Sequence, residues 1–379
     1  MLTILQHPAF LIQSQQPVVF KVQSDATGSP LRIGGGVTSD SGGDIIPADG
    51  DKKATFELSD WLQGLITERG KTANVPAVYS GVPRQLTFSF LEWIGNPQAT
   101  GDDIETPTYW LLDGRVPASI SQAFYAAHAS LLAYLVSTKR FLSWWPAGET
   151  RKVLPLQHEF LNFLQLSSQS PITITLKLLL TFTDATSAEQ TAFTVLNCAY
   201  MQLVYFPTGA TQLGIPIIMS SAYPDKMLAS YSVYVKSGSS LISEVVKYQV
   251  DDAWYQNPRF LWVRNGFGLW EVLLCTGQAS QENEIKPEQA ITDGQSLPDK
   301  LNWKTTKTDA VKVNTGFKPE AVMQWISDLD FREAYEMIGG NLVPIVMHDL
   351  KLPVVHDGIY QYSADLEYEY VHYENIEQG

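Results

Sequence analysis

Histidines beside carboxylates are the residues of this sequence that could most readily hold a metal ion or move a proton. Two His-Asp pairs, at 348–349 and 356–357, lie eight residues apart, and on neighbouring strands they could converge with His372. Their spacing matches neither the helical H-E-x-x-H pattern nor a Cys/His zinc pattern. Because polar pairs at strand ends explain the same residues, we expect surface side chains at His348, His356 and His372, with a metal site as the alternative.

A second possible cation site is the glycine- and aspartate-rich segment 40–51. It supplies the hard oxygen ligands that calcium prefers, at Asp40, Asp44, Asp49 and Asp51. Their spacing differs from that of the twelve-residue EF-hand loop. We therefore expect an ordinary acidic loop, keep calcium binding as the alternative, and predict no cofactor.

Paired carboxylates are the third candidate chemistry, because a glycosidase needs two of them roughly 5 to 10 Å apart across a sugar. The sequence offers such pairs at 102–103, 251–252 and 367/369. All three lie in expected loops or on alternating strands, where we expect side chains that face solvent. It contains no nucleophile elbow, dinucleotide fingerprint or kinase set. The Gly-Lys-Thr at 70–72 lacks the first glycine of a phosphate-binding loop, since Leu65 takes its place. We predict that the protein is not an enzyme.

Aromatic residues are more suggestive than any catalytic pattern. Tryptophans beside Arg140 and tyrosines of the last strand could form a flat platform for stacking on a sugar, at Trp144, Trp145, Tyr360, Tyr362, Tyr368 and Tyr370. Aromatic residues in strands equally build a core or a subunit interface. Both a glycan-facing surface and an interface remain open for these residues.

The charge balance argues against nucleic acid as a partner. Lys and Arg number 26 against 40 Asp and Glu, the formal net charge is −14, and no basic stripe occurs. Affinity for a phosphate backbone comes from clustered Lys and Arg that release counterions. No apolar stretch approaches the roughly 18 to 20 residues of a membrane span. We therefore predict neither nucleic-acid binding nor membrane insertion.

Both cysteines, Cys198 and Cys275, lie in apolar, strand-like runs. Cysteine in such surroundings packs as a small hydrophobic residue. We expect buried free thiols, with a disulfide or a reactive thiol as the alternative.

The fold class follows from a turn-rich composition with little charge. Only 17% of residues are charged, 11% are aromatic, and 26 Gly and 21 Pro separate short apolar runs. This composition favours strands over solvated helices. We predict a mainly β protein of two or three β-sandwich-like domains with a few short helices, at 56–69, 119–135 and 319–337.

The strongest local signal is Asn265-Gly266, which separates two aromatic runs at 260–264 and 267–274. A two-residue type I′ turn needs positive φ at both central positions, which Asn tolerates and Gly adopts without steric cost. We therefore predict a tight hairpin at 260–275 in the core of the last domain.

Composition shifts divide the chain into three expected domains. They are an N-terminal β-rich domain at 1–105, a middle β-sandwich-like domain with a short helix at 106–238, and a C-terminal β-rich domain at 239–379 that holds the hairpin and the helix near 319–337. The Lys-Ser-Gly-Ser-Ser run at 236–240 suits a linker. In the last domain, Thr305–Val313 is predicted to be an exposed strand that can add to a neighbour's sheet.

The order of these segments resembles tail-associated proteins, of the distal tail or baseplate-like kind, from phages and prophages of Bacteroidetes-type bacteria. The resemblance spans most of the chain and rests on FELSDWLQGLI, RFLSWWPAGETRKVLPLQHEFLNFL, RFLWVRNGFGLWEVLLCTG, YEMIGGNLVPIVMHDLKLP and YSADLEYEYVHYEN.

This resemblance implies a structural protein near a tail tip or baseplate, whose β-sandwich domains assemble into an oligomeric ring or collar. Its partners would be copies of itself and other tail proteins. The first ten residues, MLTILQHPAF, do not have the pattern of a signal peptide. We therefore expect synthesis in the host cytoplasm, followed by incorporation into a virion tail or extracellular assembly. The alternative is a carbohydrate-binding adhesion module that takes a surface glycan.

Overall fold

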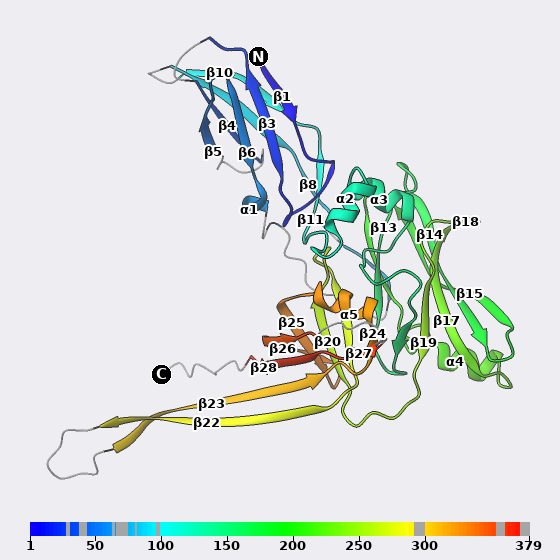
Figure 1. The fold of residues 1–379 in the computed structure, drawn as a ribbon. Helices are drawn as coiled ribbons and strands as arrows, with labels where there is room; N and C mark the ends of the chain where they lie inside the picture. Colours follow the sequence, from blue (N-terminus) through cyan, green and yellow to red (C-terminus); the bar gives the residue numbers. More distant parts are fainter. Residues whose placement is uncertain are drawn as a thin grey trace, which may run out of the picture. The chain divides into compact units, whose positions relative to one another are not determined.

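The computed structural model describes residues 1–27, 31–37, 44–62, 65, 75–79, 82–95, 99–291, 300–353 and 361–371. These residues form a mainly β protein with several sheets and five short helices (Figure 1), so the expected fold class is confirmed. The chain divides into two compact units. Unit 1 comprises Met1–Trp144, Thr150–Val250 and Asn265–Leu269, and unit 2 comprises Trp145–Glu149, Asp251–Arg264 and Trp270–Gly379.

Unit 1 begins with two small sheets joined by phenylalanine rings. One has the order β1-β3-β6, from β1 (Leu2–Gln6), β3 (Val19–Ser24) and β6 (Lys53–Glu57). The other has the order β10-β9-β4-β5, from β10 (Ala99–Glu105), β9 (Phe88–Ile94), β4 (Leu31–Val37) and β5 (Asp44–Pro47). Phe20 of the first sheet contacts Phe88 and Phe90 of the second, with ring centroids 4.8 and 5.2 Å apart. The two sheets therefore pack as a small sandwich.

A larger sheet of unit 1 has the order β12-β19-β17-β14-β15, and β18 also pairs with β17. Its strands are β12 (Arg151–Val153), β14 (Ile172–Phe182), β15 (Ser187–Cys198), β17 (Leu228–Ser237), β18 (Ser240–Leu241) and β19 (Val246–Val250). Alternation along β14 buries one face, at Ile174, Leu176, Leu178, Leu180 and Phe182. That face is part of the core cluster of this sheet.

Two three-stranded sheets complete unit 1. Their orders are β2-β11-β8 and β13-β16-β7, from β2 (Leu11–Gln13), β11 (Tyr109–Leu112), β8 (Arg84–Leu86), β13 (Phe160–Leu164), β16 (Leu203–Pro207) and β7 (Ala77–Val78). Every residue of β13 and β16 is buried. Both strands therefore belong to the interior of the unit.

The helices of unit 1 are short. They are α1 (Ser59–Leu62), α2 (Ser121–Ala127), α3 (Leu131–Thr138) and α4 (Ile215–Ala222). The helical stretch predicted at 119–135 is present as two helices, because Ser130 caps a new one by accepting a hydrogen bond from the Ala133 N–H at 3.2 Å. Helix α4 was not predicted from the sequence. No described helix is long and apolar enough to cross a membrane.

The hairpin predicted at 260–275 is confirmed, but its turn differs from the expected one. Strands β20 (Arg259–Arg264) and β21 (Trp270–Cys275) pair with Arg264 opposite Trp270. The left-handed residue of the loop is Gly268, with φ 68°, rather than Asn265 or Gly266. Its N–H donates to the Asn265 carbonyl at 2.8 Å. This is a three-residue loop closed by a left-handed glycine, not a type I′ turn.

Asn265 explains the difference, because its side chain organises the loop. Its Oδ1 accepts hydrogen bonds from the N–H groups of Phe267 and Leu269 at 2.8 and 3.2 Å, and its Nδ2 donates to the Leu142 carbonyl at 2.8 Å. Phe267 stacks on Trp144 with ring centroids 4.7 Å apart. The loop is thus part of the interior of unit 1.

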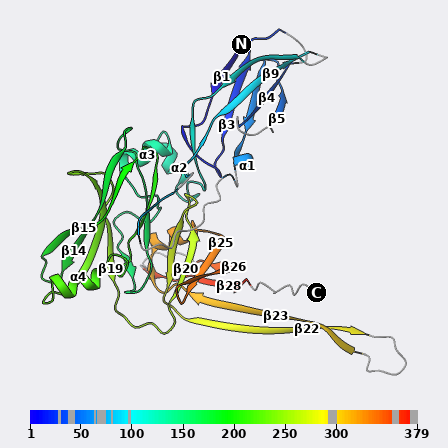
Figure 2. The same cartoon turned by 180° about the vertical axis from the view of Figure 1, so that it is seen from behind.

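The main sheet of unit 2 has the order β21-β20-β25-β26-β28-β23-β22. Besides the hairpin it contains β22 (Ala279–Ile291), β23 (Lys300–Asn314), β25 (Asp330–Ile338), β26 (Asn341–Lys351) and β28 (Asp365–Tyr370). A two-stranded sheet pairs β24 (Lys318–Pro319) with β27 (Gln361–Tyr362), and α5 (Glu320–Ser327) buries Val322, Met323, Trp325 and Ile326. Figure 2 shows β22 and β23 running together as a long ribbon.

Two helices were predicted too long. Phe56 and Glu57 belong to β6 and the described part of α1 ends at Leu62, while most of 63–74 lies outside the described residues. The helix predicted at 319–337 ends at Ser327, and β25 replaces its second half. The segment DFREAYEMI alternates, and strand pairing buries its inward residues, such as Ala334 and Glu336.

The linker expected at 236–240 is a tight turn inside a sheet. Lys236 pairs with Leu241 and Ser237 with Ser240, and Gly238 adopts the left-handed conformation that the turn requires, with φ 57°. The sheet continues through β19, so unit 1 runs on to Val250. The expected division at 238/239 therefore does not coincide with a boundary between the units.

Asn265→Ala tests the role of the loop. The substitution removes a buried side chain that is 2% exposed and leaves the partners of three hydrogen bonds unsatisfied. Each such group costs roughly 1–3 kcal/mol, so we expect the free energy of unfolding to fall by about 3 kcal/mol in guanidinium titrations. Asn341→Ala, at the exposed first residue of β26, is the control and should change stability by less than about 0.5 kcal/mol. Equal effects of the two variants would contradict this role.

The two free thiols are buried, as expected, and burial raises the pKa of Cys198 to about 11 and that of Cys275 to about 12. Thiolate is the reactive form. We therefore expect no modification of the native protein by Ellman's reagent at pH 8 and release of both thiols in 6 M guanidinium. Rapid labelling of either cysteine in the native protein would show that its surroundings open.

Candidate functional site

The candidate functional site is one side of strand β23, because its main chain has no further strand beside it among the described residues. β23 pairs with β22 from Lys300 to Val313, but with β28 only from Ala310 to Asn314. The segment Lys300–Asp309, named the open edge below, therefore has one described neighbour (Figure 1). A row of unpaired N–H and C=O groups is a template for another strand.

The strand pairing shortens the predicted exposed strand at its C-terminal end. Thr305–Val313 was predicted to be exposed along its length, but Ala310–Val313 already pair with β28. The part that can accept a new strand lies nearer the ribbon tip. Pro287 occupies β22, opposite Thr305, and proline, which cannot donate to a ladder, is typical of edge strands.

The two strands of the ribbon carry opposite charge. β22 contains three glutamates and one lysine, at Glu282, Glu284, Glu288 and Lys286. The open edge of β23 contains three lysines and one aspartate, at Lys300, Lys304, Lys307 and Asp309. A basic strand beside an acidic one is complementary to a second ribbon of the same kind.

Asn314 fixes the base of the ribbon. Its Nδ2 donates to Asp365 Oδ1 at 2.7 Å, and its Oδ1 accepts from the Gly316 N–H at 2.8 Å. Its carbonyl accepts from the Gly277 N–H at 3.0 Å. A Cβ on Gly277 would lie 2.4 Å from Asn314 Oδ1, so a larger residue there would displace the Asn314 side chain. Through its side chain and its carbonyl, this one residue therefore connects the segment before β22, the end of β23 and the beginning of β28.

A buried carboxylate joins the strands next to the ribbon. Glu336 of β25 is 1% exposed, and its Oε2 accepts hydrogen bonds from the hydroxyls of Tyr368 and Tyr370, both at 2.7 Å. Its Oε1 accepts from Arg259 Nη1 of β20 at 2.7 Å. Glu336 thus links β20, β25 and β28, and β28 in turn pairs with β23.

The same network changes the acidity of the two tyrosines. Burial and then the hydrogen bond to Glu336 raise the pKa of Tyr370 to about 12. Burial, followed by the charge of Glu336, raises the pKa of Tyr368 well above its ordinary value. Both hydroxyls therefore stay protonated at neutral pH and act as donors to the carboxylate.

Most of the predicted platform aromatics are packing residues. Trp144, Tyr362 and Tyr368 are 9%, 5% and 0% exposed, because they are packed inside their own units and cannot offer a ring face to a sugar. Trp145 is partly buried, with its Nε1 donating to the Glu149 carbonyl and its ring centroid 4.9 Å from that of Trp325. Tyr370 is partly buried by the Glu336 network, and Tyr360 lies outside the described residues.

The predicted metal-binding groups are only partly within the described residues. His348 Nε2 lies 3.4 Å from Glu369 Oε2, whereas His356 and His372 lie outside the description. In segment 40–51, Asp40 also lies outside it, and Asp49 Oδ1 accepts from the N–H groups of Asp51 and Lys53 at 2.9 and 2.8 Å. Asp49 therefore organises the turn before β6.

The carboxylates that do converge in the described residues are Asp25, Glu92 and Asp102. From the sequence, Asp102 was considered only as part of the carboxylate pair 102–103. The proximity of Glu92 and Asp102 was not predicted because it depends on the antiparallel pairing of β9 with β10, which brings together residues ten positions apart.

Glu336→Ala tests whether the buried carboxylate anchors the ribbon sheet. The substitution leaves Arg259 and two tyrosine hydroxyls without their shared partner, and breaking such a buried pair costs about 3–5 kcal/mol. We expect a guanidinium midpoint lowered accordingly and faster amide hydrogen exchange in β28. Glu320→Ala, at an exposed position of α5, should leave both measurements nearly unchanged. A Glu336 variant as stable as this control would exclude the anchoring role.

Comparisons with known proteins add little to this geometry. No protein-family model matches the chain, and no curated protein matches it. A solved structure of fibronectin(III)-like modules of CbhA from Clostridium thermocellum is 10% identical, covers 68% of this chain and 100% of its own, and has a TM-score of 0.18. A likeness of that size does not extend to a common fold or function.

Proposed function

We propose that this chain is a structural subunit of a phage tail tip, baseplate or related injection assembly, and that copies of it form an oligomeric ring or collar. The observation that carries the proposal is the open edge of the β22–β23 ribbon. Support for the tail setting comes from the sequence resemblance described above. The partners are further copies of the chain and other tail proteins.

A second copy is the occupant that best fits the open edge. The basic strand β23 of one copy faces a partner whose acidic strand β22 offers the opposite charge. Because the two surfaces differ, the contact is head-to-tail, and a head-to-tail contact closes into a ring when its rotation divides a full turn. Self-addition also protects an edge that would otherwise aggregate.

The strength of such a contact comes mainly from the backbone. Each new main-chain hydrogen bond contributes about 0.5–1.5 kcal/mol net, and exposed ion pairs contribute about 0–1 kcal/mol each. One ribbon contact is therefore modest, whereas closure of a ring gives every copy two contacts. The charges select the partner strand and its direction more than they add affinity.

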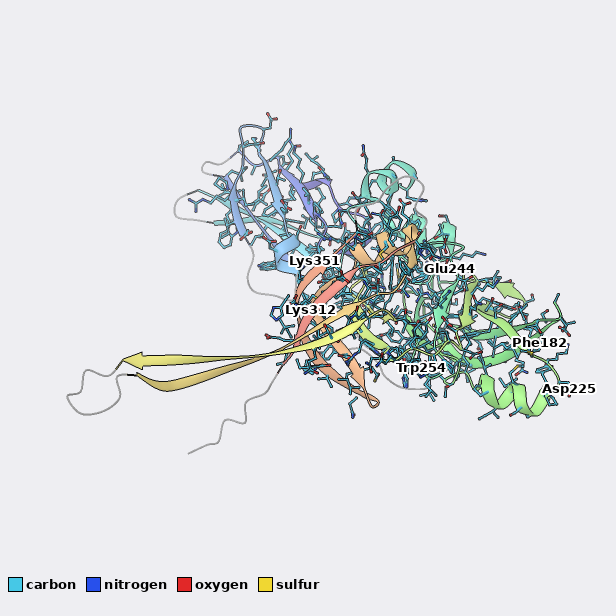
Figure 3. The ribbon with its side chains drawn as sticks, turned by 60° about the horizontal axis from the view of Figure 1, so that its bottom comes forward. Phe182, Asp225, Glu244, Trp254, Lys312 and Lys351 are labelled. Atoms are coloured by element: carbon cyan, nitrogen blue, oxygen red, sulfur yellow. The ribbon has the colours of Figure 1, made fainter. Side chains whose placement is uncertain are left out.

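A carbohydrate-binding adhesion module is the alternative, and one observation favours it. Trp254 is 83% exposed in the segment between β19 and β20 (Figure 3). An exposed indole is a surface on which a sugar ring can stack. This reading requires glycan binding by single copies, so a glycan array with Trp254→Ala as its control separates the two proposals.

Charge reversal tests the assembly. We expect sedimentation velocity of the full chain to show oligomers that weaken in 0.5 M NaCl because salt screens the edge charges. Lys304→Glu with Lys307→Glu should make the protein monomeric, and so should Glu284→Lys with Glu288→Lys. The chain that carries all four changes should oligomerise again, since both edges are reversed together.

The matched control is Lys152→Glu with Lys247→Glu, two exposed lysines of unit 1, which should leave the oligomers intact. A wild-type chain that stays monomeric up to millimolar concentration would contradict self-assembly. Oligomers that survive both edge reversals would place the contact elsewhere on the chain.

A further inference from the structure

The open edge of β23 lies directly beyond the last pair that β23 makes with β28. The two strands are antiparallel, their pairing ends with Glu369 opposite Ala310, and their register does not shift before that point. The main chain that leaves β28 is therefore directed along the open edge toward Lys300. A strand that simply continued β28 would reach this edge without a turn.

Val371, the last described residue, shows that the direction of β28 is kept past this pair. Its N–H donates to the Pro344 carbonyl of β26 at 3.1 Å, and Tyr370 lies opposite Ile345 of the same strand. In an antiparallel ladder, successive residues direct their main-chain groups to opposite sides. Because Val371 bonds toward β26, a residue that continues the strand directs its N–H and C=O groups at β23.

The sequence after Val371 suits the open edge in charge and in composition. Residues 372–377 are His-Tyr-Glu-Asn-Ile-Glu, with two carboxylates, no Lys or Arg and no proline. Opposite charges on neighbouring strands are favourable, and a segment without proline can donate a hydrogen bond at every position. An acidic strand is therefore the complement of this edge, which carries three lysines and one aspartate, at Lys300, Lys304, Lys307 and Asp309.

We propose that residues 372–377, named the strap below, continue β28 and pair with the open edge of their own chain. In the register of β28, residue 372 comes opposite Lys307 and residue 375 opposite Lys304. The pairing ends there, because the register of β23 against β22 shifts next to Lys304. No loop has to be closed for this contact, so its cost in chain entropy is small.

The strap and a second copy compete for the open edge, because they need the same main-chain groups. The strap is joined to β28, which gives it a local concentration of about millimolar or higher, whereas a second copy binds from solution. In a micromolar solution the strap is therefore the favoured occupant, and self-assembly has to displace it. The pairing itself needs no partner, but this competition rests on the proposed self-assembly.

Residue-resolved amide hydrogen exchange of the full chain, in a dilute monomeric sample, tests the strap. In the proposed register the N–H groups of Thr305 and Lys307 bond to the strap, and those of Thr306 and Thr308 bond to β22. Glu374→Pro removes the donor opposite Thr305. We expect the amides of Thr305 and Lys307 to exchange about tenfold faster in this variant, with those of Thr306 and Thr308 unchanged.

Gln378→Pro, beyond the strap, is the control and should alter the exchange of none of these amides. Equal protection of Thr305 and Lys307 in the wild type and in Glu374→Pro would overturn the strap. Protection that appears only as the protein concentration rises would overturn it too, because a second copy would then hold the edge.

Sedimentation velocity of the same three chains separates this inference from the proposed function. We expect Glu374→Pro to oligomerise at about one-tenth of the concentration that the wild type and Gln378→Pro need, because its edge is free. Oligomers that form at the same concentration in all three chains would overturn the competition. If none of the chains oligomerises while Glu374→Pro still loses protection at the edge, self-assembly is excluded and the strap is confirmed.

Discussion

Main-chain hydrogen bonding is the constraint on which the rest of this structure depends. A strand that leaves its N–H and C=O groups without partners is unstable or recruits another strand. Unit 2 meets this requirement inside its main sheet; among its described residues, Lys300–Asp309 of β23 and the outer side of the terminal strand β22 lack a second neighbouring strand. The buried Glu336 network and the Asn314 contacts matter because they hold the paired part of the sheet in place. An open edge can direct assembly only when its base is fixed.

The fold class could be predicted from the sequence because apolar alternation and turn residues are local signals. β14 shows this well, since buried residues alternate with more exposed ones along Ile172–Phe182. Segments whose residues suit both a helix and a strand were harder to predict. Asp330–Ile338 follows a real helix and contains good helix formers, yet the burial of Glu336 against Arg259 makes it a strand. Such a tertiary contact overrides local propensity and cannot be seen in a window of nine residues.

The candidate sites were less predictable, because both arise from pairing between distant segments. The polar alternation of the ribbon indicated edge strands, but which part of β23 lacks a neighbour depends on where β28 stops. The carboxylates at Asp25, Glu92 and Asp102 come together only through pairing of the strands of two sheets. The aromatic platform failed for the opposite reason, since residue type alone does not distinguish a buried ring such as Tyr368 from an exposed one such as Trp254.

The loop Asn265–Leu269 has a consequence for how the protein is made. Unit 1 includes this loop although the strands on both sides of it belong to unit 2, and unit 2 includes Trp145–Glu149 although unit 1 flanks that segment. Neither unit is therefore a continuous piece of chain. During synthesis, residues 265–269 become available to the first unit only after the β20 arm of the second unit has emerged. The order of translation and the order of folding are thus interleaved, and truncation at any single point between residues 145 and 269 leaves at least one unit without part of its own interior.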